Sequence, residues 1–105
     1  MYVYRVLLHA EWQQMLARGE FAGSDADKRD GYIHLSTQEQ VGGTIATHFG
    51  NVPRRDLVIL EIDAASLGGT LRWEESRGGA LFPHLYGVLP VSAVKQVIAS
   101  DEFER

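Results

Sequence analysis

Polar side chains that could carry out chemistry gather in two stretches of this 105-residue chain. Residues 73–87 contain an acid pair, a serine, an arginine, a Gly-Gly step, a histidine and a tyrosine, and residues 30–37 contain His34 beside hydroxyl side chains. The glycines and the proline of the first stretch disfavour a regular helix or strand. Polar loops on a small scaffold commonly carry binding or catalytic residues. We therefore expect residues 73–87 to form a functional loop.

The second stretch predicts a strand at residues 31–35 that runs directly into a helix. Ser36 and Glu39 have the spacing of a capping box, so the helix is expected to begin at Ser36. By strand alternation, Tyr32, His34 and Ser36 lie on one face. A histidine, a hydroxyl group and the free N–H groups of a helix start can together hold a polar or anionic ligand. A structural role for His34 remains the alternative.

In the longer stretch, Ser76, Arg77, Gly78 and Gly79 form a candidate anion cradle. The guanidinium of Arg77 offers a planar pair of donors to phosphate or carboxylate. The glycines allow backbone N–H groups to approach an anion closely. The alternative is a tight loop in which Arg77 pairs with an acidic side chain.

The acid pair and the histidine of this stretch complete the candidate site. If residues 71–74 form a strand, Glu74 and Glu75 point to opposite faces, so one of them meets solvent and the other can face the pocket. A pocket carboxylate can orient a ribose hydroxyl or act as a base, although both could be surface acids. His84 and Tyr86 lie two residues apart, and His84 is a candidate for either a ligand contact or a structural contact.

The two other histidines are expected to be structural, His48 on the inward face of the second helix and His9 as a cap. No histidine pair has the spacing of a common metal motif, so no metal site is predicted. The chain has no cysteine, which excludes thiolate catalysis and disulfides. It also lacks the Gly-x-Ser-x-Gly motif of serine hydrolases.

The bulk composition restricts the class of protein. A net charge of -4 argues against a general nucleic-acid binder. The N-terminus is too short and too aromatic for a signal peptide, and no segment approaches the roughly 20 apolar residues of a membrane span. We expect a cytoplasmic protein and leave its oligomeric state open.

The remaining pattern predicts a single domain over residues 1–105, of α+β class. Its sheet is expected to be small, mixed and mostly antiparallel, with two helices packed on it. Trp12, Met15 and Leu16 would form the apolar stripe of the first helix, and the Gly42-Gly43 step of the second indicates close approach of another element or a ligand. The expected elements are strands at 2–8, 31–35, 57–62 (central), 71–74, 86–89 and 94–99, helices at 9–18 and 36–49, a surface loop at 20–30, a capped turn at 63–69, a turn at 90–93 and a charged tail at 100–105.

Several runs of this chain together resemble the bacterial and plant domain of unknown function numbered 952. The resemblance covers nearly the whole chain and is carried by residues 30–37 (Asp-Gly-Tyr-Ile-His-Leu-Ser-Thr), Thr44, His48-Phe49, 57–60, 73–79 and 82–90. It implies an ADP-ribosyltransferase-like split-sheet fold, a group that includes RNA 2′-phosphotransferases. The implied cleft could hold NAD or a related ADP-ribose compound.

The resemblance also implies roles for individual residues. His34 with Ser36 and Thr37 resembles the pair that binds ribose near the nicotinamide, with Tyr86 and Glu74 as the accompanying tyrosine and glutamate and Arg77 at a phosphate. The sequence thus predicts a pocket for an anionic or nucleotide-like ligand, with possible ADP-ribosyl or phospho-transfer chemistry. Two alternatives stay open: a non-catalytic module that binds a small molecule or a protein, and a structural protein whose polar loop only stabilises the fold.

Overall fold

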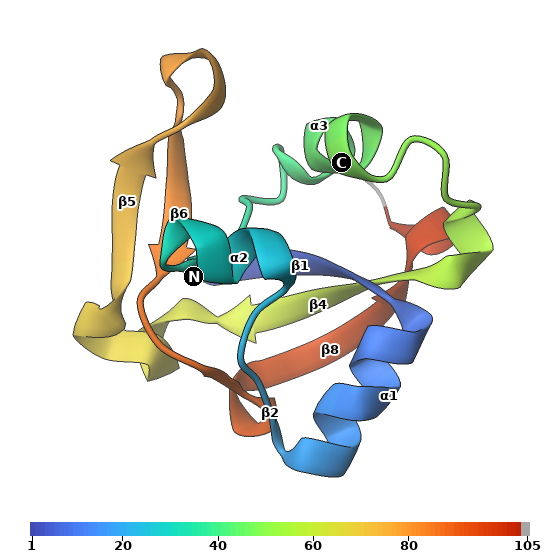
Figure 1. The fold of residues 1–105 in the computed structure, drawn as a ribbon, viewed down its shortest axis with the longest axis horizontal. Coiled ribbons are helices and arrows are strands. Elements are labelled where there is room, and N and C mark those ends of the chain that lie inside the picture. Colours follow the sequence, from blue (N-terminus) through green and yellow to red (C-terminus); the bar gives the residue numbers. More distant parts are fainter. Residues whose placement is uncertain (104–105) are drawn as a thin grey trace.

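The computed structural model describes residues 1–103, with the side chain of Arg77 outside the described part. The α+β class is confirmed, but the described chain has three α-helices rather than the two expected, and its strands form three small antiparallel sheets (Figure 1). In chain order the elements are β1 (Tyr2–Leu8), α1 (His9–Arg18), β2 (Glu20–Phe21), α2 (Asp25–Asp30), β3 (Ile33–His34), α3 (Val41–His48), β4 (Leu57–Asp63), β5 (Leu71–Glu75), β6 (Leu81–Leu85), β7 (Leu89–Pro90) and β8 (Val94–Ala99).

Strand β4 lies at the centre of the β1-β4-β8 sheet, as its nearly continuous apolar run predicts. Val58, Leu60 and Ile62 belong to one hydrophobic cluster. Leu57 and Ile59, which point to the opposite face, belong to a second. Both faces of this strand are therefore buried, and this explains why it shows no alternation of apolar and polar residues.

The helices complete these two clusters. Met15 of α1 packs into the first, and Val41 and Ile45 of α3 pack into the second. Figure 1 accordingly shows α1 and α3 on different sides of the strands. Leu16 was expected on the buried stripe of α1, but it is 48% exposed. The buried stripe of this short helix is therefore narrower than predicted, because Met15 is buried and Trp12 is only partly buried.

A short segment at residues 33–36 joins the two three-stranded sheets. His34 pairs with His84 in the register of β3 and β6. Two residues later, Ser36 and Tyr4 of β1 exchange backbone hydrogen bonds, each 2.8 Å long. The two polar stretches of the sequence are thereby brought side by side.

The prediction of a loop at residues 73–87 was wrong, because this stretch is mostly a β5–β6 hairpin. Gly78 and Gly79 are confined to its turn, where positive φ angles of 64° and 78° favour glycine. Pro83 lies within β6, and its carbonyl accepts a hydrogen bond from the N–H of Leu35. The missing N–H of a proline lies on the same strand edge as its carbonyl, so the pairing of β6 with β5 is undisturbed.

The predicted surface loop at residues 20–30 instead contains β2 and α2. Helix α2 begins at a capping box, in which the Asp27 N–H donates to Ser24 Oγ (3.2 Å) and the Ser24 N–H donates to Asp27 Oδ2 (2.8 Å). Six residues alone would not form a stable helix in water. The reciprocal cap and the burial of Asp27 supply what the short length lacks.

The helix expected from Ser36 begins only at Val41. Thr37 and Gln40 form the reciprocal pair: the Thr37 N–H donates to Gln40 Oε1 (3.0 Å), and the Gln40 N–H donates to Thr37 Oγ1 (3.2 Å). The Ser36 hydroxyl instead lies 2.9 Å from the Thr44 hydroxyl. The capping signal was therefore real but displaced by one residue, and it precedes a turn rather than the helix itself.

Smaller expectations were wrong at three positions. His48 is exposed rather than inward-facing, and a Cβ atom built on Gly43 would meet nothing within 4 Å, so the close approach expected of the Gly42-Gly43 step does not occur at Gly43. The segment expected to be a charged tail begins with a residue of the folded core, because Ser100 is buried and accepts two hydrogen bonds from Arg54. Phe103 packs edge-on against a tyrosine of β1, and the last two residues lie outside the described part.

Other expectations are confirmed. The turn after β4 is capped by Asp63, whose side chain accepts from the Ala65 N–H, and a short turn at Val91–Ala93 precedes β8. Within residues 1–103, no helix is long and apolar enough to span a membrane.

Candidate functional site

A pocket of about 390 Å³ lies where the two polar stretches meet. His34 and Ser36 of the first stretch and Ser76 and His84 of the second all line it. The wall also includes Arg5, together with the apolar side chains of Tyr4, Val6, Leu35, Phe49 and Phe82. Its size and its mainly apolar wall with a few polar groups are typical of a small-molecule site.

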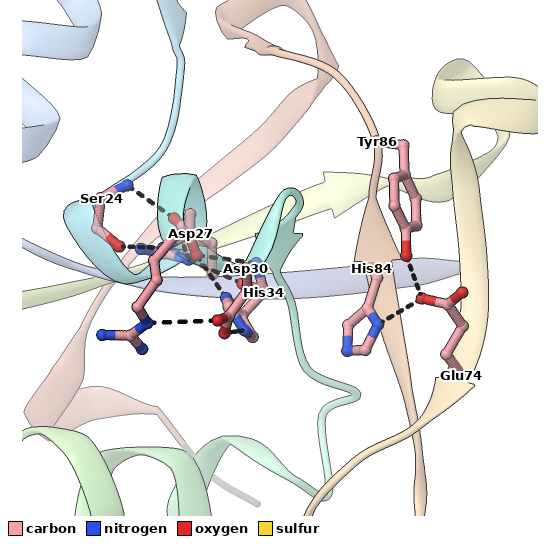
Figure 2. A network of polar contacts seen from close by, with 9 residues as sticks. Ser24, Asp27, Asp30, His34, Glu74, His84 and Tyr86 are labelled. Atoms are coloured by element: carbon pink, nitrogen blue, oxygen red, sulfur yellow. Dashed lines mark hydrogen bonds and ion pairs between the residues drawn. The ribbon is translucent and has the colours of Figure 1, made fainter.

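On one side of the pocket, His34 is held between two carboxylates of helix α2 (Figure 2). Its Nδ1 atom lies 2.6 Å from Asp27 Oδ1, and its Nε2 atom lies 3.0 Å from Asp30 Oδ2. These two contacts fix the orientation of the His34 ring against helix α2.

Asp27 is the centre of this arrangement and is almost fully buried. Its oxygens lie 3.0 and 3.1 Å from Arg5 Nη1, and they also accept the backbone N–H groups of Ser24 and His34. Burial alone would raise the pKa of this carboxyl. The hydrogen bonds from His34 and Ser24 and the charge of Arg5 outweigh burial, and they hold the pKa of Asp27 well below its ordinary value.

On the other side, His84 is held by a glutamate and a tyrosine (Figure 2). Glu74 Oε1 lies 2.7 Å from His84 Nδ1 and accepts a 2.7 Å hydrogen bond from the Tyr86 hydroxyl. The hydrogen bonds from His84 and then Tyr86 lower the pKa of Glu74, so that its carboxyl is ionised at neutral pH. The hydrogen bond from Tyr86 to Glu74, followed by desolvation, raises the pKa of Tyr86.

The exposure of His84 separates it from the other histidines. Its side chain is 2% exposed, and its Nε2 atom is buried without a hydrogen-bond partner in the protein. A carboxylate acceptor on Nδ1 fixes the neutral ring in the tautomer that leaves the lone pair on Nε2. This nitrogen is therefore set up to accept a proton or a hydrogen bond, because the chain gives it no other donor.

Tyr32 connects the two histidines. Its ring stacks on His84 with centroids 4.0 Å apart and an interplanar angle of 22°, and it also contacts His34 at 4.7 Å. The two histidine rings themselves are 5.8 Å apart. Desolvation, followed by the negative charges of Asp30 and Glu74, raises the pKa of Tyr32. The phenol thus stays protonated while it covers one face of His84.

Only some of the residues predicted to bind a ligand line this pocket. The Ser36 hydroxyl is buried on its wall, and Ser76 lines it at the base of the hairpin turn. The N–H groups of Ser76 and Gly79 are used within that turn, donating to Ala80 O and Ser76 O respectively. These two N–H groups of the candidate anion cradle are therefore not free for a ligand.

The other predicted residues lie behind or beside the pocket. Thr37 caps the turn before α3, and Gly78 shapes the hairpin turn. Tyr86 lies behind Glu74, and Glu74 itself is engaged by His84 rather than free. Glu75 is exposed, so the acid pair does point to opposite faces. The side chain of Arg77 is outside the described part.

Three residues of the site were missed from the sequence: Arg5, Asp27 and Asp30. A signal existed for each of them. Ser24 and Asp27 have capping-box spacing, Asp30 precedes His34 by four residues, and Arg5 interrupts an otherwise apolar strand. A lone charge in a buried strand indicates a buried partner, and that partner is Asp27.

The arrangement suits proton transfer more than metal chemistry. Among residues 1–103, no three His, Cys, Asp or Glu side chains are grouped so as to hold a metal ion. One histidine is held between two carboxylates, and the other combines a fixed Nδ1 with an unpartnered Nε2. Of the two rings, only that of His84 has a nitrogen without a partner in the described chain, so His84 is the one that can exchange a proton with a ligand.

Comparisons with known proteins identify relatives without assigning an activity. The family model "Protein of unknown function (DUF952)" matches residues 6–97. The crystal structure of protein CC0527 from Caulobacter crescentus is similar, with 46% identity over 92% of this chain and 83% of that one, and a TM-score of 0.85. Its solution NMR structure gives 46% identity, coverages of 93% and 83%, and a TM-score of 0.80. No curated protein matches this chain.

These matches support the α+β class and the resemblance to the family. They give no support for an ADP-ribosyltransferase-like assignment, since the solved relatives carry no stated activity.

Proposed function

This chain belongs to the DUF952 family of proteins of unknown function, and we propose that its pocket is the active site of a small acid–base enzyme. The observation that carries this proposal is the buried His84 ring, which is fixed at Nδ1 by Glu74 and unpartnered at Nε2. A histidine oriented by a carboxylate in this way is a common general base.

In this proposal His84 is the catalytic residue and Glu74 is a positioning residue. Nε2 accepts a proton from an O–H or N–H group of the bound ligand, and the ring becomes an imidazolium. The ionised Glu74, 2.7 Å away, stabilises that charge. The proton then returns from Nε2 to the product. The hydrogen bond from Tyr86 keeps the carboxylate in place during both steps.

His34 has a different part in the same site. Because both of its nitrogens face carboxylates, it is not available as a base. Its ring centroid lies 5.8 Å from that of His84, and the two aspartates hold the ring in a fixed orientation beside the reacting group. His34 therefore shapes the pocket and does not take part in the proton transfer.

For the ligand we propose a nucleotide-like molecule, following the family resemblance. NAD or ADP-ribose would place its ribose near His34 and Ser36 and its phosphate toward Arg77 and Ser76. Ser36 and Ser76 lining one pocket with both histidines supports this placement. The reaction would then be transfer at an ADP-ribosyl-type or phosphoryl centre. His84 takes the proton of the acceptor hydroxyl, the acceptor oxygen forms the new bond as the bond to the leaving group breaks, and the proton on Nε2 passes to the leaving group or to solvent.

The tautomer of His84 provides a test that needs no substrate. We expect ¹⁵N chemical shifts to show Nδ1 protonated and Nε2 unprotonated in the neutral ring, and we expect Glu74→Gln to disturb this preference. The exposed His9 provides the comparison within the same spectrum. A neutral His84 with its proton on Nε2 would refute the proposed base.

A second experiment tests ligand and activity. The wild type and His84→Gln are mixed with NAD, ADP-ribose and 2′-phosphorylated RNA, with His9→Gln as a matched control. A ligand at 100 times its dissociation constant stabilises the fold by about 2.7 kcal/mol, which a thermal-shift assay detects. We expect product only from the wild type and His9→Gln. Binding without product in any protein would indicate a non-catalytic module, and no shift with any ligand would exclude the nucleotide class.

A further inference from the structure

The pocket also indicates what kind of chemical group meets His84. In the described part of the chain, two buried side-chain nitrogens have no hydrogen-bond partner, Nε of Arg5 and Nε2 of His84. Both residues line the same pocket. Buried polar groups in proteins are almost always hydrogen-bonded, so two exceptions at one cavity indicate a shared cause. A ligand that satisfies both is such a cause.

The first of these atoms can only donate. Arg5 Nη1 is already used by Asp27 and by the His34 carbonyl (2.9 Å), and the guanidinium lies over the Phe21 ring at 5.0 Å. The side chain is 10% exposed, so water does not easily serve its remaining donors. Guanidinium nitrogens do not accept hydrogen bonds. The group of the ligand that meets Arg5 Nε must therefore be an acceptor.

The second atom has the opposite requirement. Glu74 accepts the proton of Nδ1, so Nε2 of the neutral His84 ring has a lone pair and needs a donor. Both residues adjoin His34, because Arg5 Nη1 binds its carbonyl and the His84 ring lies 5.8 Å from its ring. A ligand that satisfies both atoms from the pocket that Arg5 and His84 line must therefore bring an acceptor to one and a donor to the other.

The charges around these atoms favour an uncharged group. Asp27 compensates the charge of Arg5, and Asp27 and Asp30 occupy the two ring nitrogens of His34. A ligand carboxylate would gain little from a guanidinium that is already paired, and it would face both aspartates. It also has no proton to donate to His84. The rest of the wall is mixed: Tyr4, Phe49 and Phe82 add apolar surface, and Glu11, Arg29 and His48 add polar groups of both signs.

From these four observations we infer that the pocket takes an uncharged group of amide type, attached to an apolar or aromatic body. A carboxamide, a lactam or the edge of a nucleobase carries an acceptor oxygen and a donor N–H on neighbouring atoms. The oxygen would accept from Arg5 Nε, and the N–H would donate to His84 Nε2. This inference rests on the proposed function, since it uses the same tautomer of His84.

Three probes of equal size test the inference. Benzamide has both the donor and the acceptor, acetophenone has only the acceptor, and benzoate carries a charge and no donor. Titrations are followed by NMR on the Arg5 Nε–H and His84 ring signals of the wild type, with His9→Gln as a matched control. A buried partner left unsatisfied costs enough to weaken binding by about tenfold or more. We therefore expect benzamide to bind at least tenfold more tightly than either of the other two.

The outcomes separate this inference from the proposed function. Benzoate or acetophenone binding as tightly as benzamide would overturn the amide assignment, as would the absence of shifts at both signals with all three probes. In His84→Phe, which keeps a ring against Tyr32, the advantage of benzamide over acetophenone should disappear. If benzoate is preferred while Nδ1 of His84 is protonated, only this inference fails. If the proton is found on Nε2, the proposed function fails with it.

Discussion

Replacing Asp27 with asparagine should strongly destabilise the fold while preserving the size of the side chain. Oδ2 of the carboxylate accepts the Ser24 N–H at 2.8 Å and lies 3.0 Å from Arg5 Nη1. Oδ1 accepts the backbone and ring N–H groups of His34. An amide nitrogen in place of either oxygen would face donors, and the charge of Arg5 would lose its buried counterion.

The magnitude follows from the burial of this group. Asp27 is 2% exposed, and removal of one partner from a buried ion pair costs about 3–5 kcal/mol. A domain of this size has a total stability of roughly 5–15 kcal/mol. At about 4 °C for each kcal/mol, Asp27→Asn should lower the melting temperature by roughly 12–20 °C. Asp25→Asn, on the exposed first turn of α2, should change the stability by less than about 1 kcal/mol.

The pH dependence gives the assay a second readout. Because the folded pKa of Asp27 is lowered, its contribution is fully present above the ordinary aspartate pKa of about 3.9 and is lost as the pH falls below it. Urea unfolding of wild type and Asp27→Asn should differ by about 1 kcal/mol less at pH 3 than at pH 5. A cost below about 1 kcal/mol at pH 7, or a pH-independent difference, would refute this account of the buried carboxylate.

Two further predictions concern positions away from the pocket's ion pairs. Gly43→Ala should stabilise the protein by up to about 1 kcal/mol in urea unfolding, because Gly43 lies inside α3 with open space at its Cβ position. Gly31→Ala also adds a methyl group in open space but at a φ of 89°, so it should destabilise instead, and equal effects of the two changes would contradict this reasoning. Burial and the hydrogen bond to Glu61 raise the pKa of the Tyr4 phenol to about 12, so this contribution to stability should persist below pH 10 and be lost as the pH rises toward 12. An ultraviolet titration should show a phenol in the wild type that titrates late and is absent from Tyr4→Phe. If the phenol that Tyr4→Phe removes instead titrates near pH 10, the assignment is contradicted.

Sequence patterns predicted the elements that depend mainly on interactions between residues close together in the chain. The apolar run of β4 and the Asp63 cap after it are local features, and both were found as expected. The hairpin was missed because the rules for glycine and proline apply to strand interiors. Here Gly78 and Gly79 lie in the turn, and Pro83 directs its carbonyl to Leu35. Whether a proline is compatible with a strand depends on which edge it faces, and a sequence alone does not show this.

The candidate site was predicted in part for a similar reason. His34 and His84 were expected to share a pocket, and both line it. Their partners were assigned less well, because Asp27 and Asp30 belong to a helix at a place where the sequence predicts a loop. Glu74 was expected to meet a ligand, but it contacts His84, the residue opposite Arg72 in the β5–β6 register. Strand pairing, which fixes such contacts, is set by tertiary structure.

The two histidine–carboxylate pairs differ in how far they are coupled to folding. Asp27 is both the N3 member of the capping box of α2 and the counterion of Arg5, and it also contacts the His34 ring, so any change there alters the fold and the pocket together. Glu74 lies on the outer strand β5, where its side chain is 37% exposed and contacts His84 and Tyr86. Its replacement by glutamine therefore removes the orientation of His84 without opening the core. Of the two pairs, Glu74 and His84 are the one in which a loss of function can be separated from a loss of structure.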